Sequence, residues 1–90
     1  MTAAKPSGAA PVAFTRKQVW KLLGEPMDQV GSVNDPRTHV ECGVKWNEKW
    51  VYPNAHADGA LRVVLWNRYD LLGVFAVRPD GSAVPEPLPG

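Results

Sequence analysis

Four side chains near the middle of the chain, His39, Cys42, His56 and Asp58, are of types that bind zinc. His-x-x-Cys and His-x-Asp are not strong metal spacings, so His39, Cys42 and His56 are weak candidates. A cysteine beside a histidine could also be a nucleophile, but no oxyanion donor or third orienting residue is identifiable. Because Cys42 lies in an alternating strand pattern, it is more simply a small buried residue, and we expect no cofactor.

The carboxylates do not suggest acid-base catalysis. Asp28, Asp35, Glu41, Glu48 and Asp70 fall in turns or opposite Lys and Arg, where a carboxylate usually caps a turn or faces solvent. No glycine-rich loop lies between a predicted strand and a predicted helix, so nucleotide binding has no support. We therefore predict that the chain is not an enzyme.

Binding chemistry is indicated more strongly by the strand expected at residues 61–68, because its two faces differ. One face is aliphatic and is expected to contact a helix, whereas the other combines aromatic and guanidinium groups, which are enriched at binding hot spots. The first set is Leu61, Val63 and Leu65, and the second is Arg62, Val64, Trp66 and Arg68, with Trp46 as a further candidate.

Two interpretations of the second face remain open. Either it is an exposed docking surface, or the segment Thr38 to Trp46, or a tail, covers it and makes it a second core. Four tryptophans in 90 residues exceed the need of one core and favour an interface. If Trp66→Ala weakens docking and leaves the fold intact, the face is a surface, and if it unfolds the protein, Trp66 is core.

The helix that must support this sheet is predicted from Thr15 to Leu23. Thr15 and Gln18 form a capping box, and Val19 lies on an apolar face shared with the two leucines that follow it. Gly24 and Pro26 end the helix. Two to three turns do not persist alone, so the helix must lie on a sheet.

The strands are expected to be antiparallel. Residues 61–77 form a hairpin, and Lys49 to Tyr52 is another strand. The alternating segment Thr38 to Trp46 could pair with it through a turn at Asn47-Glu48, whereas Met27 to Arg37 is expected to be mostly irregular. The predicted fold class is α+β, with a short N-terminal helix packed on one face of a three- to four-stranded antiparallel sheet.

Length and composition indicate one domain with two tails. Residues 1–12 are rich in Ala, Pro, Gly and Ser and are predicted to be a flexible tail. Residues 13–83 form the single α+β domain, and residues 84–90 form a proline-rich tail. Ten Lys and Arg against nine Asp and Glu leave no basic excess, so we expect no nucleic-acid partner.

Cysteine usage and the N-terminal residues bear on the compartment. One cysteine allows no internal disulfide, which fits a reducing compartment. The first 13 residues contain no apolar run, so we expect a soluble chain without a membrane span. We expect a cytoplasmic protein, unless an N-terminal signal has been removed from this chain.

The order of these elements resembles the SmpA/OmlA family. The resemblance rests on T-x-x-x-V-x-x-L-L-G-x-P from Thr15 to Pro26, on Trp50-Val51-Tyr52, on Leu61-x-Val63-x-Leu65 and on the strand Gly73 to Val77. It implies short N-terminal helices on a three-stranded antiparallel sheet, similar in shape to the β-lactamase-inhibitor fold. This chain differs in having its cysteine mid-chain, not at a lipoprotein signal, and in the longer stretch between Pro26 and Trp50.

Known members of that family are non-enzymatic: outer-membrane lipoproteins of the β-barrel assembly machinery, or inhibitors that present a sheet to another protein. We therefore expect a protein-binding module that docks a partner, or a second copy of itself, through an open sheet face. The alternative is a small accessory or catalytic subunit that holds a metal or small ligand near His39, Cys42 and His56.

Overall fold

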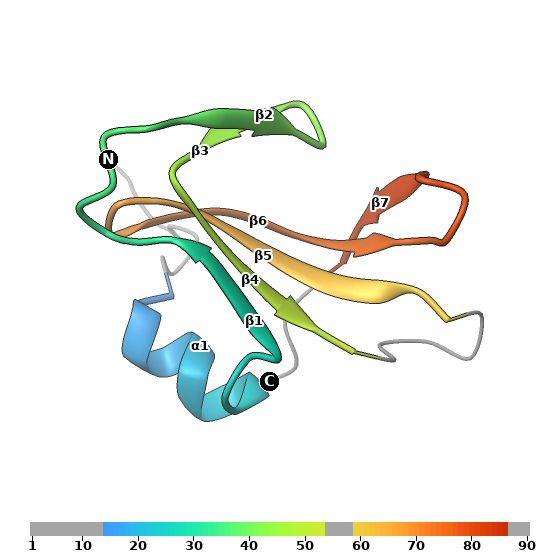
Figure 1. The fold of residues 1–90 in the computed structure, drawn as a ribbon. Coiled ribbons are helices and arrows are strands. Elements are labelled where there is room, and N and C mark those ends of the chain that lie inside the picture. The colour runs from blue at the N-terminus through green and yellow to red at the C-terminus, as the bar shows by residue number, and fades with distance from the viewer. Residues whose placement is uncertain (1–13, 54–58, 87–90) are drawn as a thin grey trace, which may run out of the picture.

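The computed structural model describes residues 14–53 and 59–86. Within these residues, one helix and two antiparallel sheets are present (Figure 1). The elements are α1 (Arg16–Leu23), β1 (Asp28–Gly31), β2 (His39–Glu41), β3 (Val44–Trp46), β4 (Glu48–Tyr52), β5 (Leu61–Asn67), β6 (Asp70–Val77) and β7 (Ala83–Pro85). The larger sheet has the order β1-β4-β5-β6-β7, and β2 and β3 form the smaller one.

The predicted α+β class with an antiparallel sheet is confirmed, but the described sheet is larger than expected. It has five strands instead of three or four, and a separate two-stranded sheet lies above it. One added strand, β1, comes from the segment 27–37 that was expected to be mostly irregular. The other, β7, pairs with β6 and carries the sheet past the domain boundary predicted at residue 83. The tail predicted at residues 1–12 lies outside the described residues.

The helix begins and ends where its sequence predicts. The Thr15 hydroxyl accepts a hydrogen bond from the Gln18 amide, and the Gln18 side chain accepts one from the Thr15 amide, which completes the capping box. Gly24 follows the last helical residue, and its amide donates to the Trp20 carbonyl. Within the described residues, no helix is long and apolar enough to cross a membrane.

The segment 38–46 is a hairpin and not one long strand. Cys42 and Gly43 have φ of 56° and 78° and form the two-residue turn between β2 and β3. Two consecutive positive φ values suit the right-handed twist of the flanking strands, and glycine adopts such a value without strain. Asn47 and Glu48 are therefore not a turn, because the chain passes through them from β3 directly into β4.

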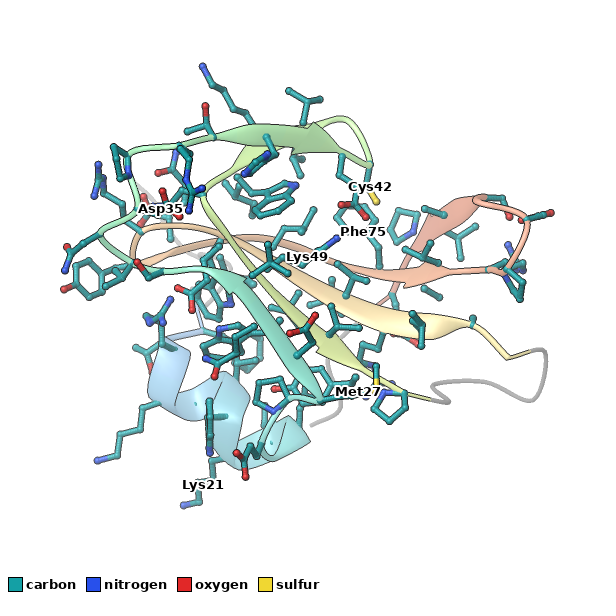
Figure 2. The ribbon with its side chains drawn as sticks, viewed as in Figure 1. Lys21, Met27, Asp35, Cys42, Lys49 and Phe75 are labelled. Atoms are coloured by element: carbon teal, nitrogen blue, oxygen red, sulfur yellow. The ribbon has the colours of Figure 1, made fainter. Side chains whose placement is uncertain are left out.

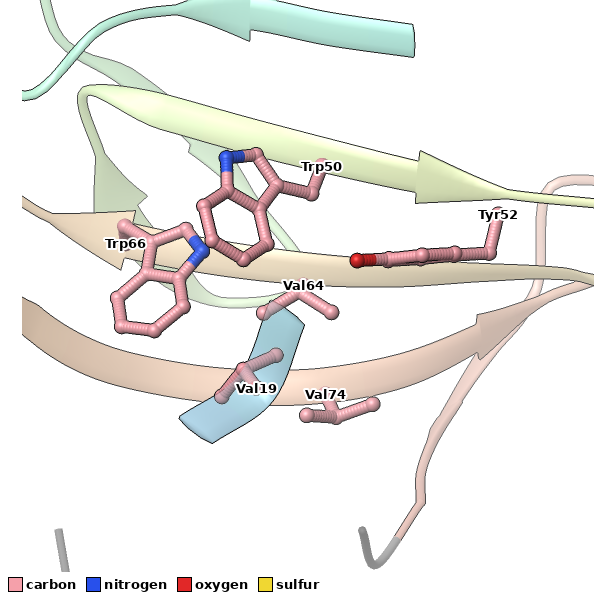
Figure 3. Close-up of a cluster of buried hydrophobic side chains, with 6 residues drawn as sticks. All are labelled: Val19, Trp50, Tyr52, Val64, Trp66 and Val74. Atoms are coloured by element: carbon pink, nitrogen blue, oxygen red, sulfur yellow. The ribbon is translucent and has the colours of Figure 1, made fainter. Parts of the chain in front are cut away.

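Strand β5 is buried on both faces, and its two faces contact different layers. Val64 and Trp66 belong to a cluster with Val19 of α1, which also contains Trp50, Tyr52 and Val74 (Figure 3). Val63 and Leu65 belong to a second cluster with Trp46, on the side of the β2–β3 hairpin. The faces are thus the reverse of the prediction, which placed Leu61, Val63 and Leu65 toward the helix.

This reversal makes Trp66 a core residue. Its side chain has no exposed surface. We expect Trp66→Ala to lower the free energy of unfolding by about 3 to 5 kcal/mol, because a large buried volume is lost. Trp66→Phe is expected to cost much less, since the Trp66 indole nitrogen has no hydrogen-bond partner among the described residues.

Urea denaturation of both variants checks this expectation, with Val40→Ala as the control because Val40 is 75% exposed. A Trp66→Ala protein as stable as the Val40→Ala protein would contradict the core assignment.

Candidate binding groove

A groove lies between α1 and the edge of the large sheet. It has a volume of about 530 Å³ and is lined by Arg16, Lys17, Trp20, Lys21, Gln29 and Trp50. Four of these residues come from α1, one from β1 and one from β4. The groove therefore depends on how α1 is held against β4 and on where β1 is placed.

The N-terminal end of α1 is fixed by a partly buried ion pair, in which Glu48 is buried and Arg16 is partly exposed. The two terminal nitrogens of Arg16 donate to the two carboxylate oxygens of Glu48 at 2.6 and 3.0 Å. The Trp50 indole nitrogen donates to the same carboxylate at 2.8 Å. The guanidinium also lies 5.0 and 5.3 Å from the ring centroids of Trp50 and Trp66. Three donors and two aromatic contacts offset the cost of burying this pair.

The other end of α1 is held by Tyr52. Its hydroxyl donates to the Gly24 carbonyl at 2.9 Å, just past the last turn of the helix. The ring is buried in the cluster with Val19, so the phenol has little access to water. This burial raises the pKa of Tyr52 to about 12, while the charge on Arg62 acts in the opposite direction.

The sheet side of the groove is fixed by Asn47. Its side-chain amide donates to the carbonyls of Ser32, Val33 and Asp35, in the loop that follows β1, and its side-chain oxygen accepts from the Arg68 amide. Gly31, at the end of β1, has φ of 78°, and an added β-carbon would collide with the Asn47 carbonyl oxygen. Glycine is required here because the two backbones approach so closely.

The charges around the groove are unevenly neutralised. Glu48 pairs with Arg16, whereas Lys17 and Lys21 make no ion pair with any described residue. Lys21 extends from α1 toward solvent (Figure 2). Trp20 is 39% exposed and meets Trp50 edge to face, with ring centroids 5.5 Å apart. The groove thus combines an aromatic wall with two unpaired cations.

The residues predicted to bind a partner do not form one surface. Val64 and Trp66 are buried beneath α1, and Trp46 is buried against the opposite face of the sheet. Arg62 donates to Glu86 at 2.8 Å, and Arg68 lies in the turn between β5 and β6, where it donates to the Val33 carbonyl. The open docking face expected around Val64 and Trp66 is therefore wrong. The face is covered, as the alternative held, but by α1 and not by Thr38 to Trp46 or a tail.

The candidate metal ligands are not brought together among the described residues. His39 begins β2, whereas Cys42 follows its end, so about 10 Å of extended chain separates them. Cys42 lies in the hairpin turn, not in a strand, and is half-buried against the cluster around Trp46 (Figure 2). Burial raises the pKa of the Cys42 thiol. His56 lies outside the described residues, and within them no group of three or more His, Cys, Asp or Glu side chains could hold a metal.

Sequence reasoning missed the pairing of Arg16 with Glu48 because it assigned Glu48 to a solvated turn. Strand parity was the available signal: Glu48 lies two residues before Trp50 and four before Tyr52, so all three face the same side. A carboxylate that shares a buried strand face with two aromatic residues needs a cationic partner. An arginine on the short amphipathic helix that covers this face is a natural candidate.

No protein-family model matches the chain, and comparisons with curated proteins and with solved structures give no match. The resemblance to the SmpA/OmlA family therefore stays a prediction.

The pair of Arg16 with the buried Glu48 leads to a stability prediction. Glu48→Gln removes the charge opposite Arg16 and turns an amide donor toward other donors, so we expect the free energy of unfolding to fall by about 2 to 4 kcal/mol. Chemical denaturation followed by tryptophan fluorescence measures this change.

The same substitution at Glu41 is the control. Glu41 pairs with Lys49 at 2.9 Å, but the Glu41 side chain is 32% exposed, whereas the Glu48 side chain is 3% exposed. Water screens the more exposed pair, so Glu41→Gln is expected to cost less than about 1 kcal/mol. Equal losses for the two variants would show that the Arg16–Glu48 pair does not hold the helix.

The burial of Tyr52 leads to a pH prediction. Because the folded-state pKa lies above the ordinary value of 10, the folded protein binds this proton more tightly than the unfolded chain. The stability that this tighter proton binding contributes to the folded state is complete below pH 10 and is lost as the pH rises toward 12. An ultraviolet titration of tyrosinate in the wild type and in Tyr52→Phe checks this, since the chain has two tyrosines. If the step that disappears in Tyr52→Phe is centred near pH 10, the burial argument fails.

Proposed function

We propose that this protein is a non-enzymatic binding module that docks an acidic segment of a partner protein in the groove between α1 and β1. The observation that carries the proposal is the combination of a partly exposed tryptophan with two lysines that have no ion pair among the described residues. Tryptophan is enriched at the centres of protein interfaces because it buries a large area with few rotatable bonds.

The charges specify the kind of partner. Arg16 is neutralised by Glu48, so the remaining charge at the groove comes from Lys17 and Lys21. An acidic segment would be attracted to this rim, and a basic one would be repelled. The apolar wall formed by Trp20 and Trp50 would accept an aromatic or aliphatic side chain from the same segment.

The groove is also held in place before any partner arrives. α1 is fixed at its first turn by Glu48, in its middle by Val19 and after its last turn by Tyr52. A wall that is already ordered costs little further conformational entropy on binding. This favours recognition of a flexible segment by a rigid site.

An enzymatic role has less support from these residues. The residues that line the groove offer two amines, a guanidinium and an amide, and the Glu48 carboxylate beneath it already accepts three hydrogen bonds. No described residue at the groove forms a nucleophile paired with a base. Within the same described residues, no observation favours the alternative of a ligand near His39 and Cys42.

A peptide selection tests the proposal. Random nonapeptides displayed on phage are selected against the full chain, and we expect enrichment of Asp and Glu next to an aromatic or large aliphatic residue. Affinity of a selected peptide is then measured by isothermal titration calorimetry. Trp20→Ala and Lys17→Glu are each expected to weaken it tenfold or more, since a groove-lining tryptophan or lysine is lost.

The matched charge control is Lys45→Glu, because Lys45 is an exposed lysine on β3, outside the groove. It should leave the affinity within about twofold. No peptide enrichment, or an equal loss in the Lys45→Glu protein, would overturn the proposal. So would tight, steeply salt-dependent binding of oligothymidylate to the same groove without any peptide binding, since it would indicate a nucleic-acid ligand.

A further inference from the structure

The two edges of the large sheet are unequally protected against strand addition. β7 is three residues long and ends in Pro85, which has no backbone N–H to donate. β1 has the sequence Asp28-Gln29-Val30-Gly31, four residues without proline, and Asp28 at its start is its one charged side chain. It is the terminal strand of the sheet, and among the described residues its only strand neighbour is β4.

The unprotected edge and the groove lie on the same part of the molecule. Gln29 of β1 lines the groove and is the cross-strand partner of Trp50, which lines it from β4. Side chains alternate along a strand, so a strand added beside β1 would direct every second side chain to the face that carries Gln29 and Trp50. These side chains would lie next to Trp20 and the lysine rim of α1.

We propose that the partner's acidic segment binds as an added β-strand on the free edge of β1, with alternate side chains in the groove. This inference rests on the proposed function and specifies its binding mode. Backbone hydrogen bonds to β1 would supply affinity, and the tryptophan wall and lysine rim would supply selectivity. The segment is therefore extended, with apolar or aromatic residues at alternate positions and carboxylates that can reach Lys17 and Lys21.

A second copy of this chain fits the same edge less well. Antiparallel pairing of β1 with the β1 of another copy continues one sheet through a twofold axis perpendicular to it. Both α1 helices would then lie on the same face, each turning its groove toward the axis. Lys17 and Lys21 of the two copies would face one another, which is unfavourable, whereas an acidic segment neutralises them.

The test uses a peptide selected on the full chain and changes only the peptide, so the fold of the protein is not at risk. Each backbone nitrogen of the peptide is methylated in turn, which removes one donor at a time. We expect losses of tenfold or more at alternate positions and small effects at the positions between them, because alternate residues of an added strand bond to its neighbour. The tolerated positions serve as internal controls for the bulk of the methyl group.

A second measurement locates the strand. Hydrogen exchange of the complex, resolved by residue, should show new protection at amides within residues 28–31 and no new protection at β7. Affinity that is indifferent to methylation at every position, while Trp20→Ala still weakens binding, would overturn strand addition and leave the groove as the binding site.

Two further outcomes distinguish a failure of the binding mode from a failure of the proposed function. Absence of any selected peptide would overturn both the binding mode and the proposed function. The last outcome is a dimer of this chain, detected by sedimentation equilibrium. If Gln29→Cys then forms a disulfide between the two copies across β1, strand addition by a partner is overturned and the edge is assigned to a second copy.

Discussion

The ion pair between Arg16 and Glu48 is the interaction on which the arrangement of helix and sheet depends. It joins residues 32 positions apart, and it places a charge-assisted contact beneath a helix of only eight residues. Such a helix has too few turns to be stable alone, and it buries a single side chain completely. Apolar burial by Val19 orients the helix, and the bidentate pair fixes its rotation and its distance from β4.

The pair also determines the character of the groove. Because Glu48 neutralises Arg16, the guanidinium becomes part of the wall, stacked near Trp50 and Trp66, and does not act as a free cation. Among the described residues that line the groove, the cations without an ion-pair partner are Lys17 and Lys21, at its rim. A site built this way separates its polar border from its apolar wall, which is the usual anatomy of a specific interface.

Local signals in the sequence predicted the local structure well. The capping box at Thr15, the glycine after the helix and the hairpin of β5 and β6 depend on neighbouring residues, and all are present. The sequence predicted which side chains of β5 share a face, but the face assigned to the helix was the wrong one, because both sets of side chains are apolar enough to be buried. The hairpin around Cys42 was missed because a cysteine with positive φ is uncommon in a turn, and the alternation of Val40, Val44 and Trp46 continued across it. Strand parity placed Glu48 on the face of Trp50 and Tyr52, but it could not identify Arg16 as the partner, because the two residues lie 32 positions apart.

The order of the strands has a consequence for how the chain folds. β4, β5, β6 and β7 are consecutive in sequence and adjacent in space, so each pairing closes a short loop. By contrast, β1 reaches β4 only after the β2–β3 hairpin has been passed, and α1 reaches Glu48 across 32 residues. Loop-closure entropy therefore favours early assembly of the four-strand meander and late docking of α1 and β1. The groove is therefore completed in the last steps of folding, when α1 and β1 join a sheet that already carries Trp50.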